Sequence, residues 1–169
     1  MTLGAVSEIS RGKRVVRKEL SQDEGFPVYQ NSLTSLGYYT KFNTSANTVF
    51  IISAGAAGEI GYSREAFWKA DDVWTIDTNV ITQRYLYHLL ISKQPQIKSQ
   101  VRKASIPRLS KMTIEQLIIP LPPLDTQAKI VQILDRFDTL TNDLSQGLPK
   151  EIERRQKQYE YFRDKLLTF

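Results

Sequence analysis

The sequence predicts an α+β protein, with a mixed α/β domain over residues 1–124 and a long two-segment coiled-coil helical arm over residues 125–169. Three observations predict this fold class. Short runs of β-branched and aromatic residues, separated by loops, recur through the first domain. Prolines at positions 120, 122 and 123 then end that domain, because proline favours extended backbone and interrupts a helix. An apolar heptad pattern follows, which is typical of a coiled coil.

The expected strands lie in the first half of the chain. Residues 26–29 should form an edge strand, and residues 38–42 resume the strand pattern. Residues 49–52 have the composition of a buried strand, and residues 67–76 that of one or two strands. The run of small residues at 53–58 indicates a tight hairpin where the backbone of a ligand could pass close by.

Two helices are expected in the second half of the first domain. The first should begin at residue 77 or 78 and continue to about residue 93, because its leucines and Tyr85 fall on one stripe. Pro95 should break this helix, since proline removes one helical hydrogen bond, and residues 96–103 would then form a second helix. Thr113 should cap a short turn that follows.

The arm contains an apolar seam, defined as the side chains spaced alternately three and four residues apart after the prolines. Asp125 is expected as the N-cap of its first helix, and Gly147-Leu148-Pro149 should separate the two helical segments. Such a seam needs a partner. Either the arm folds back on its own domain, or it dimerises or docks another protein. The seam residues are Ile130, Ile133, Phe137, Leu140, Leu144, Ile152, Tyr159, Phe162 and Leu166.

The composition limits the chemistry of the protein. The absence of cysteine excludes disulfides, thiolate metal sites and cysteine catalysis, and suits a reducing cytoplasm, which is the predicted location. No apolar run is long enough to span a membrane. The single histidine, His88, lacks a histidine or cysteine companion, and Asp71-Asp72 is better suited to a turn than to a metal. No catalytic residue, metal site or cofactor of its own is predicted.

Positive charge is concentrated in one segment. Residues 84–111 contain seven lysines and arginines and no acidic residue. Such a segment indicates a surface for a polyanion, since lysine and arginine side chains bind phosphate groups. The alternative is an ordinary helix surface whose charges are neutralised by acidic residues that fold nearby.

Matching motifs extend along almost the whole chain. They occupy residues 3–13, 26–29, 37–39, 52–58, 67–68, 85–87, 107–110, 119–124 with Gln127, 133–135 and 158–161. In this order and spacing, the sequence resembles the specificity (S) subunit of type I restriction–modification systems.

The resemblance implies a DNA target recognition domain at residues 1–124 and a conserved helical region at residues 125–169 that docks modification (methyltransferase) subunits. A full S subunit has two of each region and reads a bipartite DNA site. This chain is therefore expected to be a half, either a natural half-length subunit or a fragment, that pairs as a C2 homodimer. Adenine methylation, and restriction where a restriction subunit exists, would be directed by it. S-adenosylmethionine would be bound by the modification subunit.

The predicted DNA contacts fall into two groups. Cations should bind the phosphate backbone, and polar or small residues should approach the bases or the groove. The first group is Lys13, Arg14, Arg102, Lys103 and Arg108. The second group is Asn31, Ser32, Thr34, Tyr38, Gly55 and Gly58.

A different class of function also fits the pattern. A protein–protein adaptor could use the basic face and the arm to bind an acidic partner without reading DNA. A stand-alone methyltransferase or nuclease is disfavoured, because the chain lacks the motifs of those enzymes.

Overall fold

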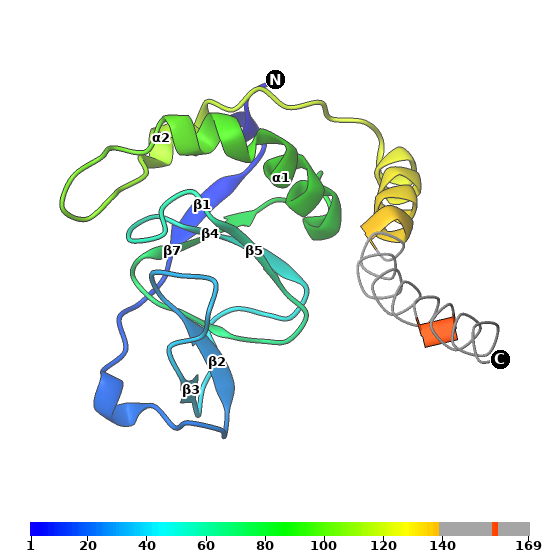
Figure 1. Ribbon diagram of the computed structural model, residues 1–169. Helices are drawn as coiled ribbons and strands as arrows, with labels where there is room; N and C mark the ends of the chain where they lie inside the picture. The colour runs from blue at the N-terminus through cyan, green and yellow to red at the C-terminus, as the bar shows by residue number, and fades with distance from the viewer. Residues whose placement is uncertain (139–156, 159–169) are drawn as a thin grey trace, which may run out of the picture. The chain divides into compact units, whose positions relative to one another are not determined.

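The computed structural model describes residues 1–138 and 157–158 (Figure 1). The chain divides into two compact units, Met1–Val131 and Gln132–Phe169. In the second unit, the described residues 132–138 and 157–158 are helical. Among the described residues, no helix has the length and apolar character needed to cross a bilayer.

A four-stranded antiparallel sheet forms the centre of the first unit. Its strands, in spatial order, are β1 (Glu8–Arg11), β7 (Val73–Asp77), β4 (Thr48–Ile52) and β5 (Ile60–Ser63). A short 3-10 turn, η1 (Leu3–Ala5), precedes β1. The predicted buried strand and the hairpin after it are confirmed as β4 and β5, which are antiparallel neighbours.

A second sheet of three short strands contains β3 (Tyr38–Tyr39), β2 (Phe26–Tyr29) and β6 (Trp68–Lys69), in that order. The 3-10 turn η2 (Arg17–Glu19) lies between β1 and β2. The prediction that β2 is an edge strand was wrong, because β2 pairs with β3 on one side and β6 on the other. Proline is tolerated in this central strand because β2 forms only two residue pairs with each neighbour. Its parallel pairing with β6 begins at Val28, after Pro27.

Helix α1 (Gln83–Ser99) packs on β4 and β5, and α2 (Lys111–Glu115) packs near η1. The predicted start at residue 77 or 78 was wrong because Asp77 completes β7. The predicted break at Pro95 was also wrong, since α1 continues through it. Packing stabilises the helix on both sides of the proline: Gln94, before it, donates to the carbonyl of Gly58 (3.1 Å), and Ile97, after it, is fully buried. Ser110, rather than Thr113, is the N-cap residue of α2.

The main hydrophobic core lies between the four-stranded sheet, α1 and the segment that contains α2. Fully buried members from these three parts include Ile51, Leu86 and Ile114. A smaller aromatic cluster joins the two sheets, where Tyr29 stacks on Phe50 with ring centroids 4.5 Å apart. The two sheets are therefore one packed domain.

The helix after the prolines begins at residue 124, and its first turns belong to the first unit. The prediction of Asp125 as N-cap was wrong. The carbonyl of Pro123 accepts the bond from the Gln127 N–H (3.0 Å), which places Asp125 inside the first turn. Ile130 and Val131 pack against the main core. The start of the arm thus packs on its own domain, which is the first of the two alternatives for this part of the seam.

Other seam residues differ from Ile130. The side chains of Ile133 and Phe137 are 54% and 61% exposed. The remaining predicted seam positions lie outside the described residues, as does the break at Gly147-Leu148-Pro149, so the coiled coil stays a prediction. Those positions are Leu140, Leu144, Ile152, Tyr159, Phe162 and Leu166.

Candidate nucleic-acid interface

Three loops that sequence analysis selected are joined by backbone hydrogen bonds. The loop at Asn31 accepts a bond from the N–H of Ala56 (2.9 Å). Gly55, in the same 53–58 loop, donates to the carbonyl of Pro107 (3.1 Å), and Leu109 donates to Ser53 (2.8 Å). Residues far apart in the sequence therefore form one continuous surface.

Gly55 allows this contact between loops. Its φ of +81° lies in the left-handed region, and an added Cβ would be 2.8 Å from the carbonyl oxygen of Asn31. Gly58 has a φ of +84° and is buried, where an added Cβ would be 3.1 Å from Cγ of Lys98. Of the two predicted groove glycines, one lies between surface loops and the other lies beneath the end of α1.

The 102–108 segment is held as a narrow loop and carries exposed cations. Arg102 and Arg108 exchange backbone hydrogen bonds of 2.8 and 3.2 Å. The side chains of Arg102, Lys103 and Arg108 are exposed, and no ion pair involves them within the part of the chain that the structure describes. Their positive charge is therefore not neutralised by an ion pair within the described residues.

Other cations of the positive segment are neutralised or packed within the domain. Lys98 pairs with Glu59 (2.7 Å) and Lys111 with Glu115 (3.2 Å). The Arg84 guanidinium lies 4.9 Å from the centroid of the Tyr62 ring, in cation–π geometry. The alternative of a neutralised surface is thus correct for Lys98 and Lys111 and does not extend to the 102–108 loop.

The basic segment after β1 is anchored to β6 and β7. Gly12 donates to Val73 (3.0 Å), and Lys13 donates to Lys69 (3.0 Å). The indole of Trp68 donates to the carbonyl of Lys13 (2.8 Å). A Cβ at Gly12 would collide with the carbonyl oxygens of Lys69 and Ala70. Gly12 therefore serves this internal packing, and the side chains of Lys13 and Arg14 remain exposed.

The remaining predicted polar residues lie on the loop between β2 and β3 or at the start of β3. The hydroxyl of Ser32 donates to the carbonyl of Thr34 (3.1 Å), a bond within a turn. Thr34 is exposed, whereas Tyr38 is half-buried in β3 opposite Pro27. Among these residues, Asn31 is the one whose backbone contacts the 53–58 loop.

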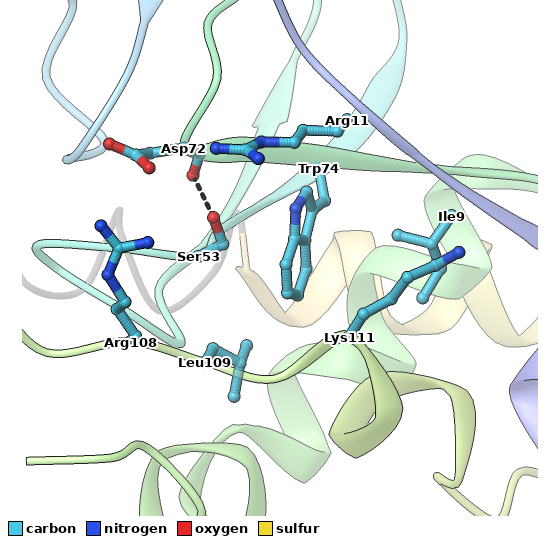
Figure 2. Close-up of a pocket in the computed structure, with 8 residues that line it drawn as sticks. All are labelled: Ile9, Arg11, Ser53, Asp72, Trp74, Arg108, Leu109 and Lys111. Atoms are coloured by element: carbon cyan, nitrogen blue, oxygen red, sulfur yellow. Dashed lines mark hydrogen bonds between the residues drawn. The ribbon is translucent and has the colours of Figure 1, made fainter.

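A cleft of about 290 Å³ lies where β1, the 71–72 turn and the 108–111 segment meet (Figure 2). Three cationic side chains and one acidic side chain line it, a net charge of +2, with apolar groups beside them. The lining residues are Ile9, Arg11, Ser53, Asp72, Trp74, Arg108, Leu109 and Lys111. Of these, the predicted DNA-contact set includes Arg108 alone.

Sequence reasoning missed the pairing of Arg11 with Trp74. These residues are distant in the sequence, and they become cross-strand neighbours because β1 and β7 pair with Arg11 opposite Trp74. Opposed residues in an antiparallel ladder point to the same face of the sheet. The one local signal was the position of Arg11 directly before Gly12 in the basic loop.

The chain belongs to the family of type I restriction modification DNA specificity domains, whose model matches residues 1–154. It is 33% identical to a putative type I specificity subunit of Mycoplasma pneumoniae over 97% of this chain and 56% of that protein. It is 31% identical to a putative type I restriction enzyme specificity subunit of Haemophilus influenzae over 99% of this chain and 47% of that protein. The resemblance found in the sequence motifs is therefore confirmed.

Solved structures show the same fold. The S subunit of a type I restriction–modification system from M. genitalium matches with a TM-score of 0.76 at 20% identity, over 99% of this chain and 45% of that one. The chain thus spans about half the length of the relatives it matches.

Proposed function

We propose that this chain is a DNA-recognition subunit that directs a type I restriction–modification system to its target sequence. The observation that carries the proposal is the convergence of loops from three parts of the chain on one surface, with Arg102, Lys103 and Arg108 exposed there and unpaired among the described residues. Exposed guanidinium and ammonium groups bind phosphate, and neighbouring loops such as that at Asn31 are placed to reach base edges. Membership of the specificity-domain family supports the same function.

In this proposal the chain supplies recognition and its partners supply catalysis. A modification subunit would bind S-adenosylmethionine and methylate adenine, and a restriction subunit, where the system has one, would cut unmodified DNA. The chain itself would contribute its loop surface and the helix that begins at residue 124.

We further propose that two copies act together on a bipartite site. The chain covers about half of its relatives' length, and Ile133, on the helix that begins at residue 124, has an exposed side chain. A C2 pair of identical domains would read a palindromic, divided sequence. This pairing rests on the predicted seam and is open to direct measurement of the mass in solution.

The test is co-expression of the chain with the modification subunit of its system, followed by mapping of methylated adenines across the host genome. A palindromic, divided motif would support recognition and the two-fold pairing together. A stable complex by light scattering, with no methylated motif, would overturn the proposal for this chain alone and indicate that a second recognition domain is needed. If the chain is an adaptor that does not read DNA, it would still form the complex with the modification subunit. Substitutions in the loops of the chain would then leave the methylated motif unchanged.

A further inference from the structure

The cleft beside β1 contains nitrogen donors that have no acceptor among the described residues. Trp74 is half-buried, yet its indole N–H makes no hydrogen bond there, whereas the indole of Trp68 donates to Lys13 (2.8 Å). The guanidinium of Arg108 likewise makes no hydrogen bond or ion pair within the described part of the chain. An indole N–H and a guanidinium group are hydrogen-bond donors only. These donors therefore suit a ligand that offers acceptors only.

The donors are held in place before any ligand arrives. Nε of Arg11 donates to the carbonyl of Asp71 (2.5 Å), which leaves the two terminal nitrogens of Arg11 for other acceptors. Ser53 fixes the neighbouring wall, since its N–H (2.8 Å) and hydroxyl (2.9 Å) both donate to the carbonyl of Asp72. Arg108 is fixed through its backbone pairing with Arg102. Such preorganisation lowers the entropy cost of binding.

Asp72 limits what can bind. Its carboxylate lines the cleft, and in Figure 2 both guanidinium groups lie at the Asp72 end. No ion pair joins Asp72 to Arg11 or Arg108 in the residues that the structure describes. The two arginines therefore keep their donors available, and the local charge remains positive.

We propose that this cleft is a phosphate clamp, in which Arg11, Arg108 and the indole N–H of Trp74 hold one phosphate of the DNA backbone. Phosphate offers acceptor oxygens only, and arginine binds it with paired N–H groups. The almost fully buried side chains of Ile9 and Leu109 complete the lining of the cleft. The clamp rests on the proposed function and adds Arg11 and Trp74 to the DNA-contact residues.

The test uses Trp74 as its own reporter. The chain has two tryptophans, so Trp68→Phe leaves Trp74 as the sole source of indole fluorescence. This variant is titrated with a labelled mixed-sequence DNA duplex at several salt concentrations. Anisotropy of the label measures binding, and Trp74 emission measures occupation of the cleft. Removal of Arg11 and Arg108, singly and together, is studied in the same background.

The clamp predicts a specific salt dependence. Each phosphate contact contributes about 0.9 to the slope of log affinity against log salt. Arg11→Ala and Arg108→Ala should each lower the slope by no more than about 0.9, and the double variant by about 0.9 in total, because both arginines hold the same phosphate. A fall of about 1.8 in the double variant would show two separate phosphates and overturn the clamp.

The fluorescence separates failure of the clamp from failure of DNA recognition. If the anisotropy of the label shows DNA binding while Trp74 emission stays unchanged, the clamp is overturned and the proposed function remains in place. No binding of DNA at low salt by the unsubstituted chain would overturn both. Trp74→Phe keeps an aromatic ring and removes the N–H, and should weaken binding by about tenfold. Lys98→Ala is the control, since Lys98 is already paired with Glu59, and it should change neither signal.

Discussion

Two polar regions of the domain differ in how fully their hydrogen bonds are satisfied. At the junction where the prolines meet the arm helix, Gln127 is fully buried and uses both ends of its side chain. Its Oε1 accepts from the N–H of Thr82 (2.9 Å), and its Nε2 donates to Val80 (2.8 Å) and Pro122 (3.0 Å). In the phosphate clamp, by contrast, the nitrogens of Arg108 and the indole of Trp74 have no acceptor within the described chain.

From this difference we infer that Gln127 stabilises the fold and that the donors of the clamp are available to bind a ligand. A buried polar group with complete hydrogen bonds contributes to stability, and its removal leaves its partners unsatisfied. An exposed donor without a partner contributes little to stability and can be used for binding. Substitutions in the two regions should therefore affect different quantities. Those at the junction should lower the free energy of unfolding, and those in the clamp and its neighbouring loop should lower DNA affinity.

The largest decrease in stability is expected at the junction. Gln127→Ala would leave the N–H of Thr82 and the carbonyls of Val80 and Pro122 without partners and would open a cavity. The free energy of unfolding should fall by about 2–4 kcal/mol, measured by urea denaturation. Lys129→Ala, at an exposed position of the same helix, is the control and should change it by less than about 0.5 kcal/mol. Equal effects of the two substitutions would show that the hydrogen bonds of Gln127 are not needed.

Sequence analysis predicted the positions of the strands in the chain better than it predicted which strands pair with each other. The residues of β2 and β4 have clear local patterns, and the small residues between β4 and β5 marked their hairpin. The central place of β2 could not be predicted, because it depends on pairing with β6, which lies much later in the chain. Helix α1 passed Pro95 for a similar reason: burial of Ile97 and the Gln94 bond to Gly58 are tertiary contacts that outweigh a local preference.

The next largest effect is expected in the loops of the candidate interface. Gly55→Ala forces a side chain into the left-handed region and against the carbonyl of Asn31, and should lower the free energy of unfolding by about 2 kcal/mol. Gly58→Ala has a similar φ penalty but meets the flexible Lys98 side chain, so about 1 kcal/mol is expected. Denaturation and DNA titration together should show that Gly55→Ala alone alters affinity, since it displaces the Asn31 loop. An equal decrease of affinity in both variants would contradict the assignment of this surface.

The same limits apply to the candidate site. Charge counting found Arg102, Lys103 and Arg108, because a run of cations without acids is visible in the sequence itself. Counting could not separate Lys98, which pairs with Glu59, from those that remain unpaired in the described chain. Trp74 carries no charge, and its place beside Arg11 depends on the register of β1 and β7.

A smaller effect is expected at Lys69, which is buried between the two sheets. Its Nζ donates to Ser10 (2.6 Å) and Thr75 (2.5 Å), and Ser10 donates to Asp77 (2.8 Å). Burial lowers the pKa of Lys69, and the Asp77 carboxylate opposes that shift. Lys69→Met removes the charge and keeps the length, and should change the free energy of unfolding at neutral pH by no more than about 1 kcal/mol.

The pH dependence at Lys69 has a definite sign. Between its lowered folded pKa and the ordinary lysine value of 10.5, the unfolded chain binds the proton more readily than the folded chain. The contribution of Lys69 to the free energy of unfolding should therefore rise with pH through that window. The free energy of unfolding of the wild type should rise relative to that of Lys69→Met. Burial raises the pKa of Tyr29 and Tyr85 in both proteins, so their effect cancels in the difference. A difference that stays constant as pH rises would contradict the cost of burying this charge.

The smallest effect on stability, joined to a clear effect on binding, is expected in the 102–108 loop. Arg102→Ala with Lys103→Ala removes two exposed cations, so the free energy of unfolding should change by less than about 0.5 kcal/mol. Affinity should fall for all DNA sequences alike, and the salt slope should decrease by about 1 for each phosphate that the variant no longer binds. Parallel titrations with mixed-sequence duplexes and with a duplex that contains the mapped target site measure both the affinity and the salt slope. A changed sequence preference would show that these side chains read bases, and would move them from the phosphate-binding group to the specificity-determining group.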